Sequence, residues 1–310
     1  MQKKPLLTIG LPVFNGDQFL EKRIQNILSQ TFQDYELIIS DNNSTDNTSK
    51  ICADFKKKDE RIQYFRQEKN IGGILNYEFV LNKAETKYFV FATADDLWSE
   101  TFLSKNIMIL NDDSSIVGSI GEIKWVGHNM TDIKKPKTKN SFFMSFYQKI
   151  QSRYGRYGSF SIFDNTYEKR AIQYLKKLIS HDPSNILYSI FRTEELQKCI
   201  TPKIFVGQFY SSFWNNVCLN ILEYGNIHLS KDNQIFYYDG GSGAEVTPII
   251  QYMRKQITLK QCIIPWGSQI SWCVHKFGMK FFFKHFFTFL QLFIQGEITF
   301  VYSIFKYLKN

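Results

Sequence analysis

The chain has 310 residues, of which 44% are hydrophobic and 22% charged, and a formal net charge of +9. This length allows one large or two modest domains, and the positive charge favours an anionic partner such as a phosphorylated substrate or a membrane surface. Its five cysteines are scattered without a C-x-x-C pair, which argues against a zinc site or a disulfide framework and is typical of a reducing compartment.

Strand and helix patterns alternate over the first 127 residues. Apolar runs predict strands at 6–14, 35–40, 62–67, 87–93 and 115–127. Apolar residues at helical spacing lie between them, and the helix that contains Leu103 is expected to start at Asp96 or Ser99. Such alternation predicts a mostly parallel sheet covered by helices on both faces, with ligands beyond the carboxyl ends of the strands.

The pattern is looser after residue 127. A helix is expected around 167–179, followed by a strand at 186–192 and a short helix at 193–198. A further helix is expected at 212–224, and the strand that begins near residue 235 runs into the glycine turn GGSG.

Polar loops follow the predicted strands of the first half. In chain order they are PVFNGD (12–17), SDNNSTDNT (40–48), NIGGILN (70–76) and TADDLW (93–98). Because the strands are expected to be parallel, their carboxyl ends and these loops should meet at one edge of the sheet. Two interpretations are open for the aspartates in these loops: each caps a turn or a helix, or they bind a ligand or a divalent metal.

Taken in this order, the four loops resemble the nucleotide-sugar-binding half of glycosyltransferase family 2, whose fold is called GT-A. The resemblance covers residues 5–127 clearly and extends more loosely to residue 243. It implies a Rossmann-like α/β fold and an inverting transferase that moves a sugar from a nucleoside-diphosphate sugar, with UDP favoured. The implied acceptor is a hydroxyl of a lipid-linked or cell-surface glycan.

The resemblance also implies which residues bind the donor. Asp41 would accept the imide N–H of the base, and Asp95 would hold Mn²⁺ or Mg²⁺ on the diphosphate, with Asp96 as a further metal ligand. Thr93 stands where the family typically has another Asp, so the site is one charge short. The full donor set is Pro12, Phe14, Asn15, Asp41, Asn43, Asn70, Gly72, Gly73, Asn76, Thr93, Ala94 and Asp95.

The catalytic base is less clear from the sequence. Family members often carry an Asp before a helix that ends in glycine, and in this chain Phe213 occupies that position. An inverting transfer needs a carboxylate to take the proton of the acceptor hydroxyl. Asp182 and, as an alternative, Asp239 are the candidates, and either residue is equally compatible with a plain loop. Phe213 and Thr93 leave a second function open, a catalytically silent nucleotide-sugar-binding subunit of a partner transferase.

Residues 277–310 form a distinct C-terminal segment that contains ten Phe and a single acid, Glu297. Phe282, Phe286, Phe289, Leu290 and Phe293 share a helical face, opposite Lys284, Thr288, Gln291 and Gln295. An amphipathic helix of this kind fits contact with a membrane surface, and the alternative is packing on the catalytic domain or on a second copy in a homodimer.

The expected organisation is therefore a GT-A domain at 1–243, divided at residue 127 into donor and acceptor halves, and a helical extension at 244–310. The expected location is the cytoplasm, at the inner face of the cell membrane. The chain shows no recognised nucleic-acid-binding motif.

Overall fold

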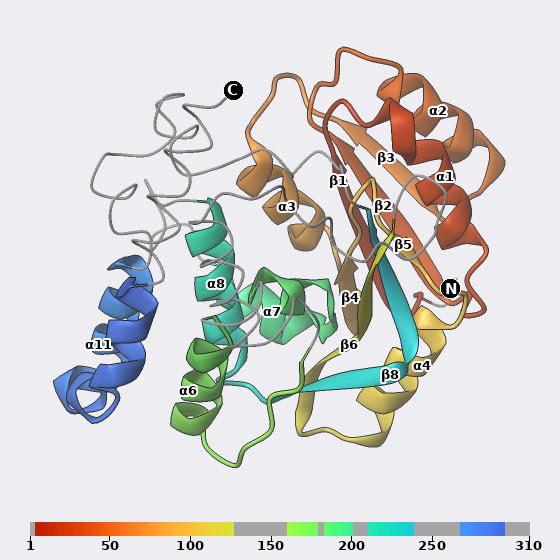
Figure 1. The fold of residues 1–310 in the computed structure, drawn as a ribbon. Helices are drawn as coiled ribbons and strands as arrows, with labels where there is room; N and C mark the ends of the chain where they lie inside the picture. The colour runs from red at the N-terminus through yellow and green to blue at the C-terminus, as the bar shows by residue number, and fades with distance from the viewer. Residues whose placement is uncertain (1–3, 127–159, 179–182, 201–209, 239–266, 295–310) are drawn as a thin grey trace, which may run out of the picture.

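The computed structural model describes residues 4–126, 160–178, 183–200, 210–238 and 267–294. Within these ranges one sheet is covered by helices on both faces, as Figure 1 shows. The strands are β1 (Leu7–Val13), β2 (Tyr35–Asp41), β3 (Ile62–Arg66), β4 (Tyr88–Phe91), β5 (Leu97–Trp98), β6 (Ile116–Val126), β7 (Ile190–Arg192) and β8 (Asn226–Tyr238). The helices are α1 (Asp17–Leu28), α2 (Thr48–Lys58), α3 (Gly73–Asn82), α4 (Phe102–Asp112), α6 (Tyr167–Leu178), the 3₁₀ helix η1 (Pro183–Tyr188), α7 (Thr193–Cys199), α8 (Tyr210–Ile221) and α11 (Gly267–Lys284).

The strand order in the sheet is β3-β2-β1-β4-β7-β6-β8-β5. The first four of these strands are parallel, as are β6 and β8, whereas β7 and β5 run antiparallel to their neighbours. The carboxyl ends of β1 to β4 therefore lie at one edge of the sheet. This arrangement confirms the prediction of an α/β fold with a mostly parallel central sheet.

The central strand β1 is buried along its whole length, as expected for a parallel strand that helices cover on both faces. Pro12 is tolerated in this strand although it has no N–H to donate. The β1–β4 pairing ends where Gly10 lies opposite Phe91, and Pro12 lies beyond that pair. The ladder therefore loses no hydrogen bond to β4 at this position.

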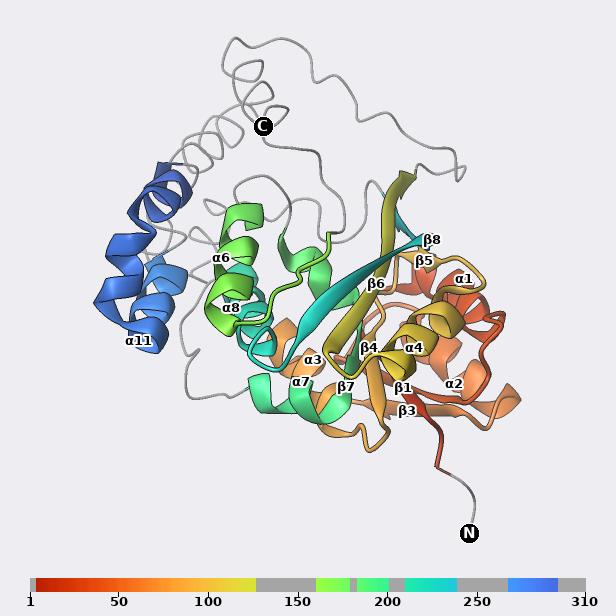
Figure 2. The same ribbon diagram turned by 90° about the horizontal axis from the view of Figure 1, so that it is seen from below.

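Helices α1, α2 and α4 lie on one face of the sheet, and α3, α7 and α8 lie on the other (Figure 2). Helix α1 buries Leu20, Ile24 and Ile27, which recur at helical spacing on the side facing the sheet. The aromatic side chains of Tyr77 on α3 and Trp214 on α8 meet with their ring centroids 5.0 Å apart. These contacts join the helices of the second face into one layer.

Two segments differ from the sequence-based expectation. Of the strand expected at 186–192, residues 186–188 belong to η1 and only Ile190–Arg192 joins the sheet. A proline at the first position of η1 favours a helical turn. Helix α4 begins at Phe102, after the short strand β5. Ser99 does not cap that helix: its N–H and hydroxyl bond the backbone of Gln234. A partner this distant in sequence leaves no local signal.

Helix α11 packs on the rest of the molecule with one face. Phe277 contacts Tyr167 of α6 at a ring separation of 4.9 Å, and Lys284 pairs with Glu168 at 2.6 Å. The chain kinks at Gly278, where φ is +79°, a value that favours glycine. The buried apolar residues of α11 and of the helical residues 286–294 after it are Trp272, Cys273, Phe281, Phe289 and Leu292.

The prediction of which side chains form the exposed apolar face of this segment is only partly correct. Phe289 is buried and stacks on Phe282, and Thr288, expected on the polar face, is also buried. The helical run is interrupted at His285, which changes the register of the faces. The exposed large apolar side chains in this segment are Met279, Phe283, Phe286, Phe287, Leu290, Phe293 and Ile294; we call them the aromatic patch. In the described ranges we find no helix with both the length and the apolar character needed to span a bilayer.

Candidate active site

The loops that follow the first four strands meet at the carboxyl edge of the sheet. The backbone N–H of Asn15, after β1, donates to the Ser44 hydroxyl, after β2, at 2.9 Å. A Cβ added to Gly16 would lie 3.5 Å from the Cβ of Ala94 in the loop after β4. The predicted convergence of these loops is therefore present in the structure.

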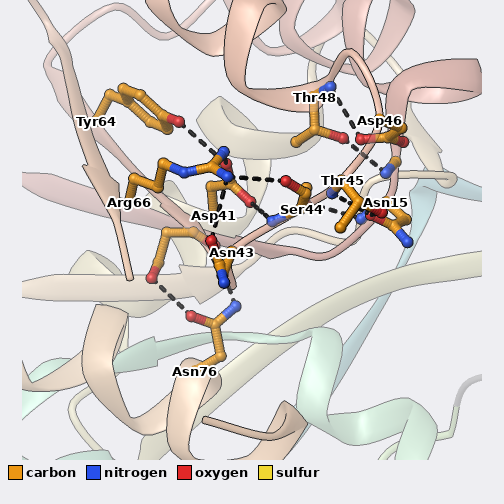
Figure 3. A network of polar contacts seen from close by, with 12 residues as sticks. Asn15, Asp41, Asn43, Ser44, Thr45, Asp46, Thr48, Tyr64, Arg66 and Asn76 are labelled. Carbon is orange, nitrogen blue, oxygen red and sulfur yellow. Dashed lines mark hydrogen bonds and ion pairs between the residues drawn. The ribbon is translucent and has the colours of Figure 1, made fainter. Parts of the chain in front are cut away.

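Asn15 takes part in the polar contacts between these loops, as Figure 3 shows. Asn15 has a φ of +49°, a conformation that asparagine tolerates better than most residues. This turn directs its side-chain oxygen to the N–H of Thr45, at 2.9 Å. Pro12 is buried next to this turn, whereas Phe14 is exposed. Asn15 therefore connects the first loop to the second.

Asp41 ends β2 with a carboxylate that is 0% exposed. Its Oδ1 accepts the N–H of Ser44 at 2.8 Å, and its Oδ2 accepts from the Tyr64 hydroxyl at 3.0 Å and from Arg66 at 2.9 Å. Burial and the Asp41 charge raise the pKa of Tyr64 to about 12, so this tyrosine remains a donor. The Arg66 side chain is 40% exposed and also bonds Asn43 at 3.1 Å. Arg66 therefore covers the buried carboxylate.

The third loop is held by Asn42, a residue that the sequence analysis missed. Its side chain donates to the Oδ1 of Asn70 at 3.0 Å and accepts the N–H of Ile71 at 2.8 Å. The Oδ1 of Asn70 also accepts the N–H of Gly72, which has a φ of +86° and precedes the α3 start at Gly73. The only sequence signal for Asn42 was its place directly after Asp41 at the strand end.

Asn76 points back to the sheet from α3 (Figure 3). It is buried, its Oδ1 accepts from the Ser40 hydroxyl at 2.6 Å, and its amide donates to the Ser40 carbonyl at 3.0 Å. Both polar atoms of the side chain thus bind β2. This contact fixes α3, and with it the Gly72–Gly73 turn, relative to Asp41.

The turn after β4 carries the two adjacent aspartates. Asp96 is buried, and its Oδ2 accepts the Thr93 hydroxyl at 2.6 Å, while Asp95 is half-buried. Thr93 stands at the position where the family typically has another aspartate, and there it donates a hydrogen bond to the Asp96 carboxylate. Asp96 is oriented within the turn and does not cap α4.

Arg23 of α1 lies behind this turn and was also missed. It is completely buried; its Nε donates to the Thr93 carbonyl and its Nη1 to Asn26, both at 3.0 Å. Its guanidinium also stacks over the Trp98 ring at 3.9 Å. Burial lowers the pKa of Arg23 to about 9, although the charges of Asp96 and Asp95 oppose this shift. The available signal was a charged residue on the same helix face as Leu20, Ile24 and Ile27.

The carboxylates of the turn after β4 could bind a hard divalent cation together with a phosphorylated ligand. Mg²⁺ and similar ions are commonly bound by one or two carboxylates together with substrate phosphates. The turn provides two carboxylates, Asp95 and Asp96. The described ranges contain no group of three or more His, Cys, Asp or Glu arranged to hold a metal. The residues therefore fit a cation that is shared with a diphosphate and not a closed protein cage.

The two candidate bases, Asp182 and Asp239, lie outside the described residues. Phe213, at the position expected for a family aspartate, is 2% exposed in α8. Its ring contacts Trp214 edge to face at 4.7 Å. Phe213 is therefore a core residue in this helix.

Comparison with known proteins gives sequence relatives that match about a third of the chain. One of them, the GalNAc(5)-diNAcBac-PP-undecaprenol beta-1,3-glucosyltransferase of Campylobacter jejuni, is 38% identical over 93 residues, which are 30% of each chain. The chain spans less than half of the length of this relative and of three other curated relatives.

Two solved structures share the fold. The mannosyltransferase PcManGT from Pyrobaculum calidifontis, in complex with GDP-Man and Mn²⁺, has a TM-score of 0.53 at 14% identity, over 97% of this chain and 74% of that one. Residues 1–349 of S. aureus TarS with UDP-GlcNAc have a TM-score of 0.50 at 16% identity, over 80% and 63%. These likenesses confirm the predicted GT-A fold.

The family profile described as Glycosyl transferase family 2 matches residues 8–190. That range contains all four strand-end loops and more than half of the chain. The expected resemblance is thereby confirmed, and this chain belongs to glycosyl transferase family 2.

Proposed function

We propose that this chain is an inverting glycosyltransferase that moves a sugar from a UDP-sugar to a hydroxyl of a lipid-linked or cell-surface glycan. The observation that carries the proposal is the juxtaposition of Asp41, at the end of β2, with the Thr93–Asp96 turn after β4 on one sheet edge. Such an arrangement suits a nucleotide sugar, whose base would lie at Asp41 and whose diphosphate, which links the ribose to the sugar, would lie at the turn.

In this proposal the base lies at the end of β2. A carboxylate accepts the imide N–H of uracil, and the buried Asp41 has Oδ2 facing Tyr64 and Arg66. Because Arg66 is partly exposed, its guanidinium can leave Oδ2 when the base arrives. The TarS structure contains UDP-GlcNAc and the PcManGT structure contains GDP-Man. Guanine also carries N–H donors, so both bases enter the test below.

The diphosphate lies at the Thr93–Asp96 turn. When bound there, Mn²⁺ or Mg²⁺ would be held by Asp95 and Asp96 and would supply positive charge to the departing diphosphate. The PcManGT complex contains Mn²⁺, which supports this assignment. Thr93 orients the Asp96 carboxylate through their 2.6 Å hydrogen bond.

The transfer forms one bond and breaks another. The acceptor oxygen bonds to the anomeric carbon of the sugar as the bond from that carbon to the phosphate oxygen breaks, and the nucleoside diphosphate leaves. A carboxylate takes the hydroxyl proton; we assign this role to Asp182, with Asp239 as the alternative. The undecaprenol in the name of the Campylobacter relative supports a lipid-linked acceptor.

The second candidate function is a silent nucleotide-sugar-binding subunit. The observation that favours it is the buried Phe213, a side chain that cannot accept a proton, at the family aspartate position. The two functions share donor binding and differ in turnover.

A binding and transfer assay tests the proposal. UDP, GDP and their sugars are titrated by calorimetry with and without Mn²⁺, and released nucleotide is then measured with lipid-linked acceptors. We expect tight UDP binding that Mn²⁺ strengthens, and at least a hundredfold loss of turnover in Asp95→Asn. Tight binding without turnover across the acceptors would establish the silent subunit, and absence of nucleotide binding would refute both functions.

A further inference from the structure

Arg23 is an unusual residue for the buried face of α1. A buried charge is costly unless it is paired and hydrogen-bonded, and Leu20, Ile24 and Ile27 complete this face with apolar side chains. Two of the guanidinium nitrogens donate to Thr93 and Asn26, but Nη2 makes no hydrogen bond within the described residues. Packing alone would be better served by Met or Leu at this position.

The contacts of Arg23 connect it to the turn that carries the aspartates. Its Nε holds the Thr93 carbonyl, and Thr93 in turn donates from its hydroxyl to Asp96. Asn26, the other partner of Arg23, clamps Trp98 by accepting its N–H at 2.9 Å and donating to its carbonyl at 2.8 Å. Arg23 and Asn26 thus hold the turn at both ends, next to Asp95 and Asp96.

The charge of Arg23 also bears on cation binding. Asp95 and Asp96 carry two negative charges when ionised, and one buried guanidinium reduces the local sum to a single negative charge. Charges interact more strongly in a protein interior than in water, so this cation opposes a second cation at the turn. A donor diphosphate adds negative charge at the same place and restores the attraction.

We propose that Arg23 is a positioning residue that fixes the Thr93–Asp96 turn and offsets one carboxylate charge, so that a divalent cation binds firmly only together with the donor diphosphate. This inference rests on the proposed function, because it requires that the turn receives a diphosphate. It explains why the chain retains a costly buried charge behind a turn that already has one carboxylate fewer than the family pattern.

The test uses the full chain and measures Mn²⁺ affinity from the electron paramagnetic resonance signal of free Mn²⁺. Titrations are made with and without UDP and corrected for the Mn²⁺–UDP complex that forms without protein. The neutral variants are Arg23→Met and Arg23→Gln, and Arg23→Lys retains the charge. Lys22→Met removes one exposed charge from the adjacent position of α1 and serves as the matched control.

Without UDP, we expect both neutral variants to bind Mn²⁺ about tenfold more tightly than the wild type, because a like charge has been removed. UDP should increase the Mn²⁺ affinity of these variants by a factor about tenfold smaller than in the wild type. Arg23→Lys should retain the weak Mn²⁺ binding without UDP, and its turnover should fall because lysine cannot donate to Thr93 and Asn26 with a planar fork. Lys22→Met should match the wild type.

Folding of each variant is checked by circular dichroism, and either neutral variant alone is sufficient for the comparison. If the neutral variants, Lys22→Met and the wild type bind Mn²⁺ with equal affinity, the inference is wrong. The proposed function would still stand in that case, provided that the wild type binds UDP. Absence of UDP and Mn²⁺ binding by the wild type would instead remove the proposed function, and the inference with it.

Discussion

A single buried carboxylate organises the candidate base site. Asp41 accepts hydrogen bonds from the loop after its own strand, through Ser44, and from two side chains of β3, Tyr64 and Arg66. Hydrogen bonds to an ionised acceptor are roughly twice as strong as neutral ones. Arg66 is the partner that a ligand can replace most readily, because it is more exposed than Tyr64 and Ser44.

Asp41→Asn separates the structural from the binding role of this carboxylate. The change removes the ion pair with Arg66 and should lower the free energy of unfolding by about 1–3 kcal/mol, since a buried charged hydrogen bond is lost. UDP affinity should fall about tenfold in addition, because an amide oxygen is a weaker acceptor for the imide N–H.

Urea unfolding and calorimetric UDP titration measure the two effects, and the exposed Glu60→Gln, which also removes one negative charge, is the control. Lower stability with unchanged UDP affinity would leave Asp41 a purely structural residue.

Individual residues also show the limits of prediction from sequence. Asp41, Asp95 and Asp96 come at the ends of apolar runs, so these runs and the alternation of strands with helices were enough to predict that their loops meet at one edge. Arg23 and Asn42 were missed because their partners, Thr93 and Asn70, are distant in the chain. Hydrogen bonds between residues that are distant in the chain leave no periodic pattern in the sequence.

At the scale of elements, strands β1 to β4 and β6 were predicted from the sequence, whereas the antiparallel strand β5 was missed and only the last three residues of the strand expected at 186–192 are present, as β7. Strands β1 to β4 are apolar runs whose helical connections imply parallel pairing. Strand β5 has only two residues and exists because it pairs with β8, with Leu97 opposite Phe236. Strand β7 likewise has three residues inserted between β4 and β6. Such strands are defined by their neighbours and not by their own composition.

Helix α8 allows a test of whether Phe213 belongs to the core or to the site. The side chain is 2% exposed and packs on Trp214. Phe213→Ala should therefore lower the free energy of unfolding by about 3–5 kcal/mol through lost burial and the cavity that remains. UDP affinity should be unchanged.

Chemical denaturation measures this effect, and Phe163→Ala, at a ring that is 44% exposed, should cost less than about 1 kcal/mol. A small stability loss in Phe213→Ala accompanied by loss of turnover would show instead that this ring faces the acceptor.

At the scale of the whole molecule, α11 combines the two alternatives raised by the sequence. One face packs on α6 through Phe277 and the ion pair of Lys284 with Glu168, and on the end of α8 through the ion pair of Lys276 with Glu223, in the turn that directly follows that helix. The aromatic patch is exposed on the C-terminal part of α11 and on the helical residues 286–294 that follow it. We propose that the patch contacts the surface of the cell membrane from the cytoplasmic side. The net charge of +9 favours an anionic surface.

The patch can be removed without disturbing the packed face. Phe283 and Phe287 are 67% and 78% exposed, so the double change to Ser should leave the free energy of unfolding within about 0.5 kcal/mol per site. Burial of one phenyl side chain in an apolar phase contributes about 1.5–3 kcal/mol. The double variant should therefore lose at least tenfold in binding to phosphatidylglycerol vesicles, measured by co-sedimentation.

Two comparisons make this experiment specific to the patch. Met108→Ser alters a side chain that is 58% exposed on α4, away from the patch, and should bind vesicles like the wild type. Phosphatidylcholine vesicles and high salt should both weaken wild-type binding, because basic residues contribute through an attraction that ions screen. Unchanged vesicle binding in the double variant would refute the membrane proposal. A change from dimer to monomer in sedimentation velocity would identify a second copy of the chain as the partner of the patch.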